Sequence, residues 1–124
     1  MLTGKTILIV EDDKDQARVL AIFLRKLGAN VLAANSLKEA AGQVMYFTFD
    51  LIILDLNLGD GTGYDLVRLL REAQIPTPVL AMSGAFDAYQ AKQDGYFDYQ
   101  IEKPIIKNDL RKLVLEITAI PVAN

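Results

Sequence analysis

Six polar residues that could carry chemistry stand at or just beyond the ends of short apolar runs: Glu11, Asp12, Asp13, Asp55, Ser83 and Lys103. The chain of 124 residues contains no Cys and no His. Thiolate metal sites, zinc sites that use His and catalytic triads that use His are therefore excluded. Any chemistry must use carboxylates, the Lys amine, hydroxyl groups and the backbone.

Carboxylates that meet repel one another, and each tends to take up a proton unless a cation lies among them. A hard divalent ion held by a few oxygens and several waters fits such a group, which favours Mg²⁺ over a caged Ca²⁺. The charges of Mg²⁺ and Lys103 would offset three carboxylates, so the site could accept an anion. Phosphate is the anion that carboxylate, Mg²⁺ and Lys most often handle together. We assign Asp55 as the nucleophile, because a carboxylate can form an acyl phosphate.

Each of these residues also has a purely structural explanation. Glu11 and Asp13 could be acids at the start of a helix, favoured by its dipole, and for Asp13 we prefer this explanation. Ser83 could be a turn residue, and Lys103 an ordinary exposed lysine. A site is favoured only if one edge of a sheet brings these residues together.

The elements that must position these residues alternate along the chain. Five short apolar runs rich in β-branched residues predict strands: Thr6–Val10, Asn30–Ala34, Leu51–Leu54, Pro78–Met82 and Tyr99–Glu102. Segments with helical spacing lie between and after them. The first helix stops at Gly28, the second opens at Ser36 with Glu39 in a capping pattern, and the third follows Thr62 and turns Leu66, Leu69, Leu70 and Ala73 inward. The fourth is short, at Asp87–Gln93, and the last covers about Asn108 to Ile120.

This alternation predicts an α/β fold, a doubly wound five-stranded parallel sheet with five helices on its two faces. In the flavodoxin-like strand order 2-1-3-4-5, the first and third strands are neighbours. Ligands bind beyond the carboxyl ends of the strands in such sheets. The carboxylates of Glu11, Asp12 and Asp55 are therefore expected to converge near Ser83 and Lys103.

Composition limits the remaining possibilities. With 52% hydrophobic and 23% charged residues, the chain can form a packed core, and we expect one domain over residues 1–124. The run Ile7–Val10 is too short for a signal peptide or a membrane span, so we expect a cytoplasmic protein that does not contact membranes. A formal charge of −3 without a Lys/Arg cluster argues against direct nucleic-acid binding.

Four segments in order resemble the receiver domain of two-component response regulators: Ile7–Asp13, Asp50–Leu58 followed by Asp60, Gly61 and Gly63, Ala81–Gly84, and Lys103-Pro104. Each segment alone is weakly specific, but the four at these separations are highly specific. The resemblance covers nearly the whole chain. It implies a phosphoacceptor signalling domain rather than an enzyme, with self-catalysed phosphotransfer and dephosphorylation as its only chemistry.

The resemblance also implies a role for each site residue. Asp55 would take a phosphoryl group from a histidine kinase or a histidine phosphotransfer protein, and the chain would then act on a downstream protein target. Asp12 would bind Mg²⁺ directly, Glu11 mainly through water, and Asn57 through its backbone carbonyl, with Asp55 also among the metal ligands. Ser83 and Lys103 would contact phosphoryl oxygens, and the Lys103–Pro104 peptide bond is cis in the family.

The sequence departs from the family pattern in two places. Receiver domains usually have an aromatic switch residue three positions before the Lys, where this chain has Gln100 beside Tyr99. The interval from Ser83 to Lys103 is also short for the family, and Gly95 comes early, which predicts a shortened fourth helix. The phosphorylation site is expected to be intact, whereas the usual output surface is altered.

Three other functions remain open at this point. A degenerate receiver would bind partners without being phosphorylated. An aspartyl-phosphate phosphatase of the haloacid dehalogenase type would need a second Asp two residues after the nucleophile, where this chain has Asn57. A flavin-binding module would need Ser, Thr and Gly in its first loop, where this chain has Glu11, Asp12 and Asp13.

Two further parts of the sequence, the first helix and the Gly-rich segment 59–63, each have two possible interpretations. Val19, Ile22 and Phe23 lie off the inward stripe of the first helix, so this helix could dock a kinase helix pair or pack against the last helix. The Gly-rich segment 59–63 is expected to be a flexible turn that leads into the third helix, rather than a dinucleotide-binding fingerprint.

Overall fold

A five-stranded parallel sheet forms the centre of the molecule. The computed structural model describes residues 1–84 and 97–120. In the order across the sheet, the strands are β2 (Asn30–Ala34), β1 (Thr6–Val10), β3 (Leu51–Asp55), β6 (Val79–Ser83) and β7 (Tyr99–Glu102). The predicted order is confirmed, because these are the five predicted strands in the arrangement 2-1-3-4-5. β1 and β3 are neighbours, with Val10 beside Leu54.

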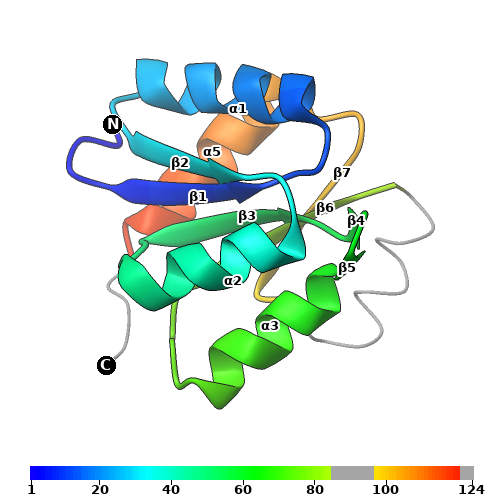
Figure 1. Cartoon of the computed structure of the whole chain (residues 1–124). Helices are drawn as coiled ribbons and strands as arrows, with labels where there is room; N and C mark the ends of the chain where they lie inside the picture. The colour runs from blue at the N-terminus through cyan, green and yellow to red at the C-terminus, as the bar shows by residue number, and fades with distance from the viewer. Residues whose placement is uncertain (85–96, 121–124) are drawn as a thin grey trace.

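The helices cover both faces of the sheet (Figure 1). On one face lie α1 (Lys14–Lys26) and α5 (Lys107–Thr118), and on the other lie α2 (Leu37–Tyr46) and α3 (Gly63–Glu72). These are the four helices of the described residues, and the predicted helix at Asp87–Gln93 lies outside them. Among the described helices, none combines the length and the apolar character that crossing a membrane requires.

Alternate residues of the central strands enter two separate hydrophobic cores. Leu8, Ile52 and Leu54 face the core beneath α2 and α3. Ile7, Ile9 and Ile53 face the core beneath α1 and α5. The central strands are buried on both faces and therefore contain continuous apolar runs, as is typical of parallel sheets: Ile7–Val10, Leu51–Leu54 and Val79–Met82.

The helix ends follow the expected capping chemistry. The Oγ of Ser36 accepts a hydrogen bond from the Glu39 amide at 3.0 Å, and the Glu39 carboxylate accepts one from the Asn35 amide. Gly28 ends the first helical segment with a φ of 103°, which a glycine adopts without strain. The inward placement of Ala73 is wrong: this residue is the exposed C-cap of α3.

The segment after β3 differs from the flexible turn expected there. Two short antiparallel strands, β4 (Asn57–Leu58) and β5 (Gly61–Thr62), form a hairpin. α3 follows it directly, and the Asp65 carboxylate accepts a hydrogen bond from the Thr62 amide at 3.0 Å. The hairpin therefore joins β3 to α3 with defined geometry.

Candidate functional site

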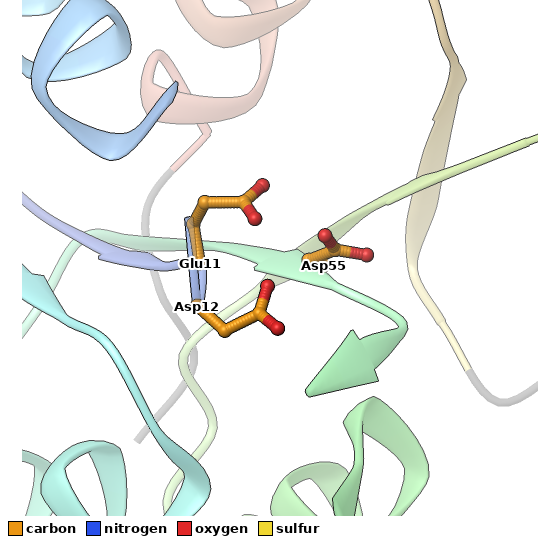
Figure 2. A group of neighbouring side chains, drawn as sticks. All are labelled: Glu11, Asp12 and Asp55. Carbon is orange, nitrogen blue, oxygen red and sulfur yellow. The ribbon is translucent and has the colours of Figure 1, made fainter. Parts of the chain in front are cut away.

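Three carboxylates converge at the carboxyl ends of β1 and β3. Glu11 and Asp12 follow β1, and Asp55 is the last residue of β3. One carboxylate oxygen from each lies within 4.8 Å of the others. Figure 2 shows the carboxyl groups of Glu11 and Asp12 extending towards the side on which Asp55 lies. The neighbouring positions of β1 and β3 cause this convergence, because parallel strands end at the same edge.

Glu11 is the most buried acid of this cluster, with 2% of its surface exposed. Its Oε1 accepts a hydrogen bond from the Asp13 amide at 3.2 Å, whereas its Oε2 has no hydrogen-bond partner among the described residues. Burial, reinforced by the charge of Asp55, raises the pKa of Glu11 from 4.5 to about 7. In the metal-free protein, Glu11 is therefore partly protonated near neutral pH.

Lys103 supplies a positive charge to the same space from the end of β7. Its Nζ donates a hydrogen bond to Asp55 Oδ2 at 2.9 Å and lies 3.7 Å from Glu11 Oε2. Burial alone would lower the pKa of Lys103, but the hydrogen bond to Asp55 and the charges of the carboxylates outweigh it, so the pKa is raised. The ammonium therefore stays charged. The peptide bond that joins Lys103 to Pro104 is cis.

Asn57 and Ser83 flank Asp55 on two sides. The Asn57 amide donates a hydrogen bond to Asp55 Oδ1 at 3.1 Å, which fixes the carboxylate. Ser83 ends β6, one position beyond Met82, the register partner of Asp55. Its side chain is 2% exposed, and its Oγ has no hydrogen-bond partner in the part of the chain that the structure describes. Such a buried hydroxyl group can bind an oxygen that enters the site.

The donor set fits Mg²⁺. It consists of hard carboxylate oxygens on two adjacent strands, and Glu11 Oε2 is a buried acceptor without a hydrogen-bond donor among the described residues. Asp13 is not part of this donor set. Its Oδ1 accepts hydrogen bonds from the amides of Asp15 and Gln16 at 3.0 and 3.1 Å. It therefore caps α1, as the structural explanation for this residue predicts.

Sequence reasoning assigned no role to two residues that brace the site. Asn35 donates a hydrogen bond from its Nδ2 to the Glu11 carbonyl at 3.1 Å. Asp60, at the tip of the β4–β5 hairpin, accepts hydrogen bonds from the amides of Leu37 and Lys38 at the start of α2. Only the Asp60-Gly61 pair gave a local signal, that of a tight turn.

The raised pKa of Glu11 predicts a pH-dependent stability in metal-free protein. Between the unfolded pKa of 4.5 and the folded pKa of about 7, the folded state binds more protons, so the free energy of unfolding falls as pH rises through this window. Glu11→Gln should remove this decrease, on the order of 1–3 kcal/mol. The chain has no His, so few other side chains titrate in this range.

Urea unfolding in the presence of a chelator, at about pH 5 and about pH 8, measures the free energy of unfolding of the wild type and of Glu11→Gln. We expect Glu11→Gln to be the more stable protein at the higher pH and the two to converge at the lower pH. Equal pH dependence in the two proteins would contradict the raised pKa.

Comparisons with known proteins agree with this geometry. Residues 7–115 match the family model described as the response regulator receiver domain. The cell cycle transcriptional regulator CtrA of Caulobacter vibrioides is 34% identical over 106 residues, which cover 84% of this chain and 46% of CtrA. The response regulator protein PilR of Pseudomonas aeruginosa is 36% identical over 110 residues, which cover 86% of this chain and 24% of PilR. The chain thus spans less than half of the length of these relatives.

Solved structures show the same architecture. A putative response regulator from Chloroflexus aurantiacus superposes with a TM-score of 0.85 at 29% identity, covering 94% of this chain and 98% of that one. The chemotaxis response regulator CheY4 of Vibrio cholerae also has a TM-score of 0.85, at 23% identity, covering 93% of this chain and 99% of that one. The latter likeness concerns the fold alone.

Proposed function

Because the chain belongs to the response regulator receiver domain family, we propose that Asp55 accepts a phosphoryl group from a phosphohistidine of a histidine kinase or phosphotransfer protein. Residues 1–124 would act as one receiver domain. The observation that carries the proposal is the position of Asp55, whose carboxylate lies beside two further carboxylates and the Lys103 ammonium. This arrangement suits the capture of an anionic phosphoryl group.

In the proposed transfer, an oxygen of Asp55 forms a bond to phosphorus as the bond from phosphorus to the histidine nitrogen breaks. The electron pair of the broken bond stays on the imidazole, which takes up a proton as it leaves. Asp12, Glu11, Asp55 and the Asn57 carbonyl would hold Mg²⁺, which when bound supplies positive charge against the phosphoryl oxygens. Lys103 and Ser83 would bind the remaining oxygens.

Phosphorylation would then change what the surface near Ser83 presents to a protein target. The new group adds negative charge and acceptor oxygens beside a hydroxyl group that has no partner among the described residues. Gly84 follows Ser83, and a Cβ added there would meet no atom of the described residues within 4 Å. The proposed output is therefore a phosphorylation-controlled protein interaction.

The direct test uses acetyl phosphate, a small phosphodonor, with the intact chain and Mg²⁺. Intact-mass spectrometry should show the mass increase of one phosphoryl group, and a chelator should prevent it. No increase at saturating Mg²⁺, with the chain folded, would contradict the proposal and favour a receiver that binds partners without being phosphorylated.

The phosphohistidine donor is proposed to dock beside α1. A groove of about 510 Å³ lies between α1 and the start of α5, with Glu11 and Lys103 among its lining residues. Val19, on this groove, is 56% exposed, and Ile22, on the same helix, is 45% exposed. Phe23 also lines this groove and packs partly against the core beneath α1 and α5.

Replacing the exposed residues tests this docking surface. The double variant Val19→Ser and Ile22→Ser should weaken transfer from a cognate phosphohistidine donor about tenfold, because small contributions from exposed apolar contacts add up at an interface. Labelling by acetyl phosphate should stay unchanged, since neither residue belongs to the carboxylate cluster. Met45→Ser, which alters an exposed residue on α2, is the control. Unaltered transfer in the double variant would contradict docking on α1.

A further inference from the structure

The N-terminal end of α2 is hydrogen-bonded both to the segment after β1 and to the β4–β5 hairpin. On one side, Asn35 just before the helix donates a hydrogen bond to the Glu11 carbonyl at 3.1 Å. On the other side, the amides of Leu37 and Lys38 donate hydrogen bonds to the Asp60 carboxylate at 2.8 and 3.2 Å. Figure 1 shows this end of α2 beside the β4–β5 hairpin.

The hairpin in turn contains Asn57, which lies next to the carboxylate cluster. Asn57 pairs with Thr62 across the hairpin, and its amide holds Asp55 Oδ1. The preceding amide, that of Leu56, is bonded to the Met82 carbonyl at 3.2 Å, so the base of the hairpin is anchored to β6. The tip is anchored through Asp60. Asn57 therefore lies between two fixed points.

Close packing supports the same attachment. A Cβ added at Gly61 would lie 2.7 Å from Leu37 Cδ2, so the backbone of the hairpin lies against the Leu37 side chain at the start of α2. The hydrogen bond from the Leu37 amide lowers the pKa of Asp60, which keeps the carboxylate ionised beside the positive end of the helix.

We propose that Asp60 is a positioning residue for the phosphorylation site. By bonding to the first amides of α2, it holds the hairpin so that the Asn57 carbonyl and the Asp55 carboxylate face the metal position together. This inference rests on the proposed function, because it concerns the Mg²⁺ site of the same carboxylates. It goes beyond that function in assigning a role to a side chain that contacts neither the metal position nor the phosphoryl group.

The test compares two variants that each remove hydrogen bonds from the same helix end. Asp60→Ala removes both bonds between α2 and the hairpin. Ser36→Ala, the matched control, removes the bond from the Glu39 amide to the Ser36 Oγ but leaves the hairpin attached. Both should loosen the start of α2, and amide hydrogen exchange measures how far. Asp60→Asn, which keeps an acceptor oxygen, should recover part of the attachment.

The expected difference lies in Mg²⁺ affinity, measured by an NMR titration of the backbone amides without a phosphodonor. Asp60→Ala should bind Mg²⁺ about tenfold more weakly, because losing a residue that orients the metal ligands typically weakens metal binding by about this factor. Ser36→Ala should match the wild type, and Asp60→Asn should fall between. Labelling of Asp60→Ala by acetyl phosphate should be slow at limiting Mg²⁺ and recover at saturating Mg²⁺.

Three outcomes would count against these ideas in different ways. Wild-type affinity in Asp60→Ala would overturn the positioning role alone. An equal loss in Ser36→Ala would also overturn it, because helix stability rather than the hairpin would then control the site. A wild-type chain that neither binds Mg²⁺ nor accepts a phosphoryl group would overturn the proposed function, and this inference with it.

Discussion

Asp55→Asn is expected to abolish the mass increase that acetyl phosphate and Mg²⁺ produce in the wild-type chain. A carboxamide oxygen is a far poorer nucleophile than a carboxylate, and the substitution also removes one of the three charges that would hold the cation. The fold should persist, because the Asn oxygen can still accept the hydrogen bond from the Asn57 amide. Intact-mass spectrometry and thermal unfolding of the same sample measure both effects.

Asp13→Asn is the matched control for this loss. Asp13 lies in the same acidic run, but its carboxylate caps α1, and Asn is an equally good capping residue. The control should accept a phosphoryl group at the wild-type level. If Asp55→Asn gains the same mass as the wild type, the acceptor is another residue, and peptide mapping of the labelled variant would identify it.

The fold could be predicted because its signals are local and repeated. The continuous apolar runs of β1 and β3 and the capping residues Ser36 and Gly28 each act over a few residues. Strand ends were less predictable. Asp55 and Ser83 are polar and were placed just outside their strands, yet both belong to the ladder, opposite Met82 and Glu102. Composition alone does not show that a strand extends into a functional site.

The meeting of the site residues could be predicted from strand order, but their surroundings could not. From its sequence position Glu11 could also be a helix-start acid, and nothing local in the sequence indicates its burial or its pKa of about 7. The β4–β5 hairpin has strands of two residues, too short to show any periodicity. Asp60 reaches partners more than twenty residues away, and no local pattern specifies such a contact.

Lys103→Met is expected to slow labelling by acetyl phosphate by roughly two orders of magnitude at saturating Mg²⁺, the loss typical when one preorganised charge is removed from a transfer site. In the wild type, the ammonium donates a hydrogen bond to Asp55 at 2.9 Å. It can donate to a phosphoryl oxygen instead once the phosphoryl group is transferred. Met retains much of the apolar length of the side chain, so packing should change little. Time courses of intact mass measure the rate.

Mg²⁺ affinity separates this role from a general loss of structure. Lys103 lies 3.7 Å from Glu11 and repels any cation that approaches the carboxylates, so its removal should leave Mg²⁺ binding equal or tighter while transfer slows. Lys107→Met, on the same groove, removes a positive charge farther from Asp55 and should leave both quantities near the wild-type values. Weakened Mg²⁺ binding together with slow transfer in Lys103→Met would instead mean that Lys103 maintains the shape of the site. Opposite changes in affinity and rate would assign it to the transfer step, because a group that only supports the fold affects binding and transfer in the same direction.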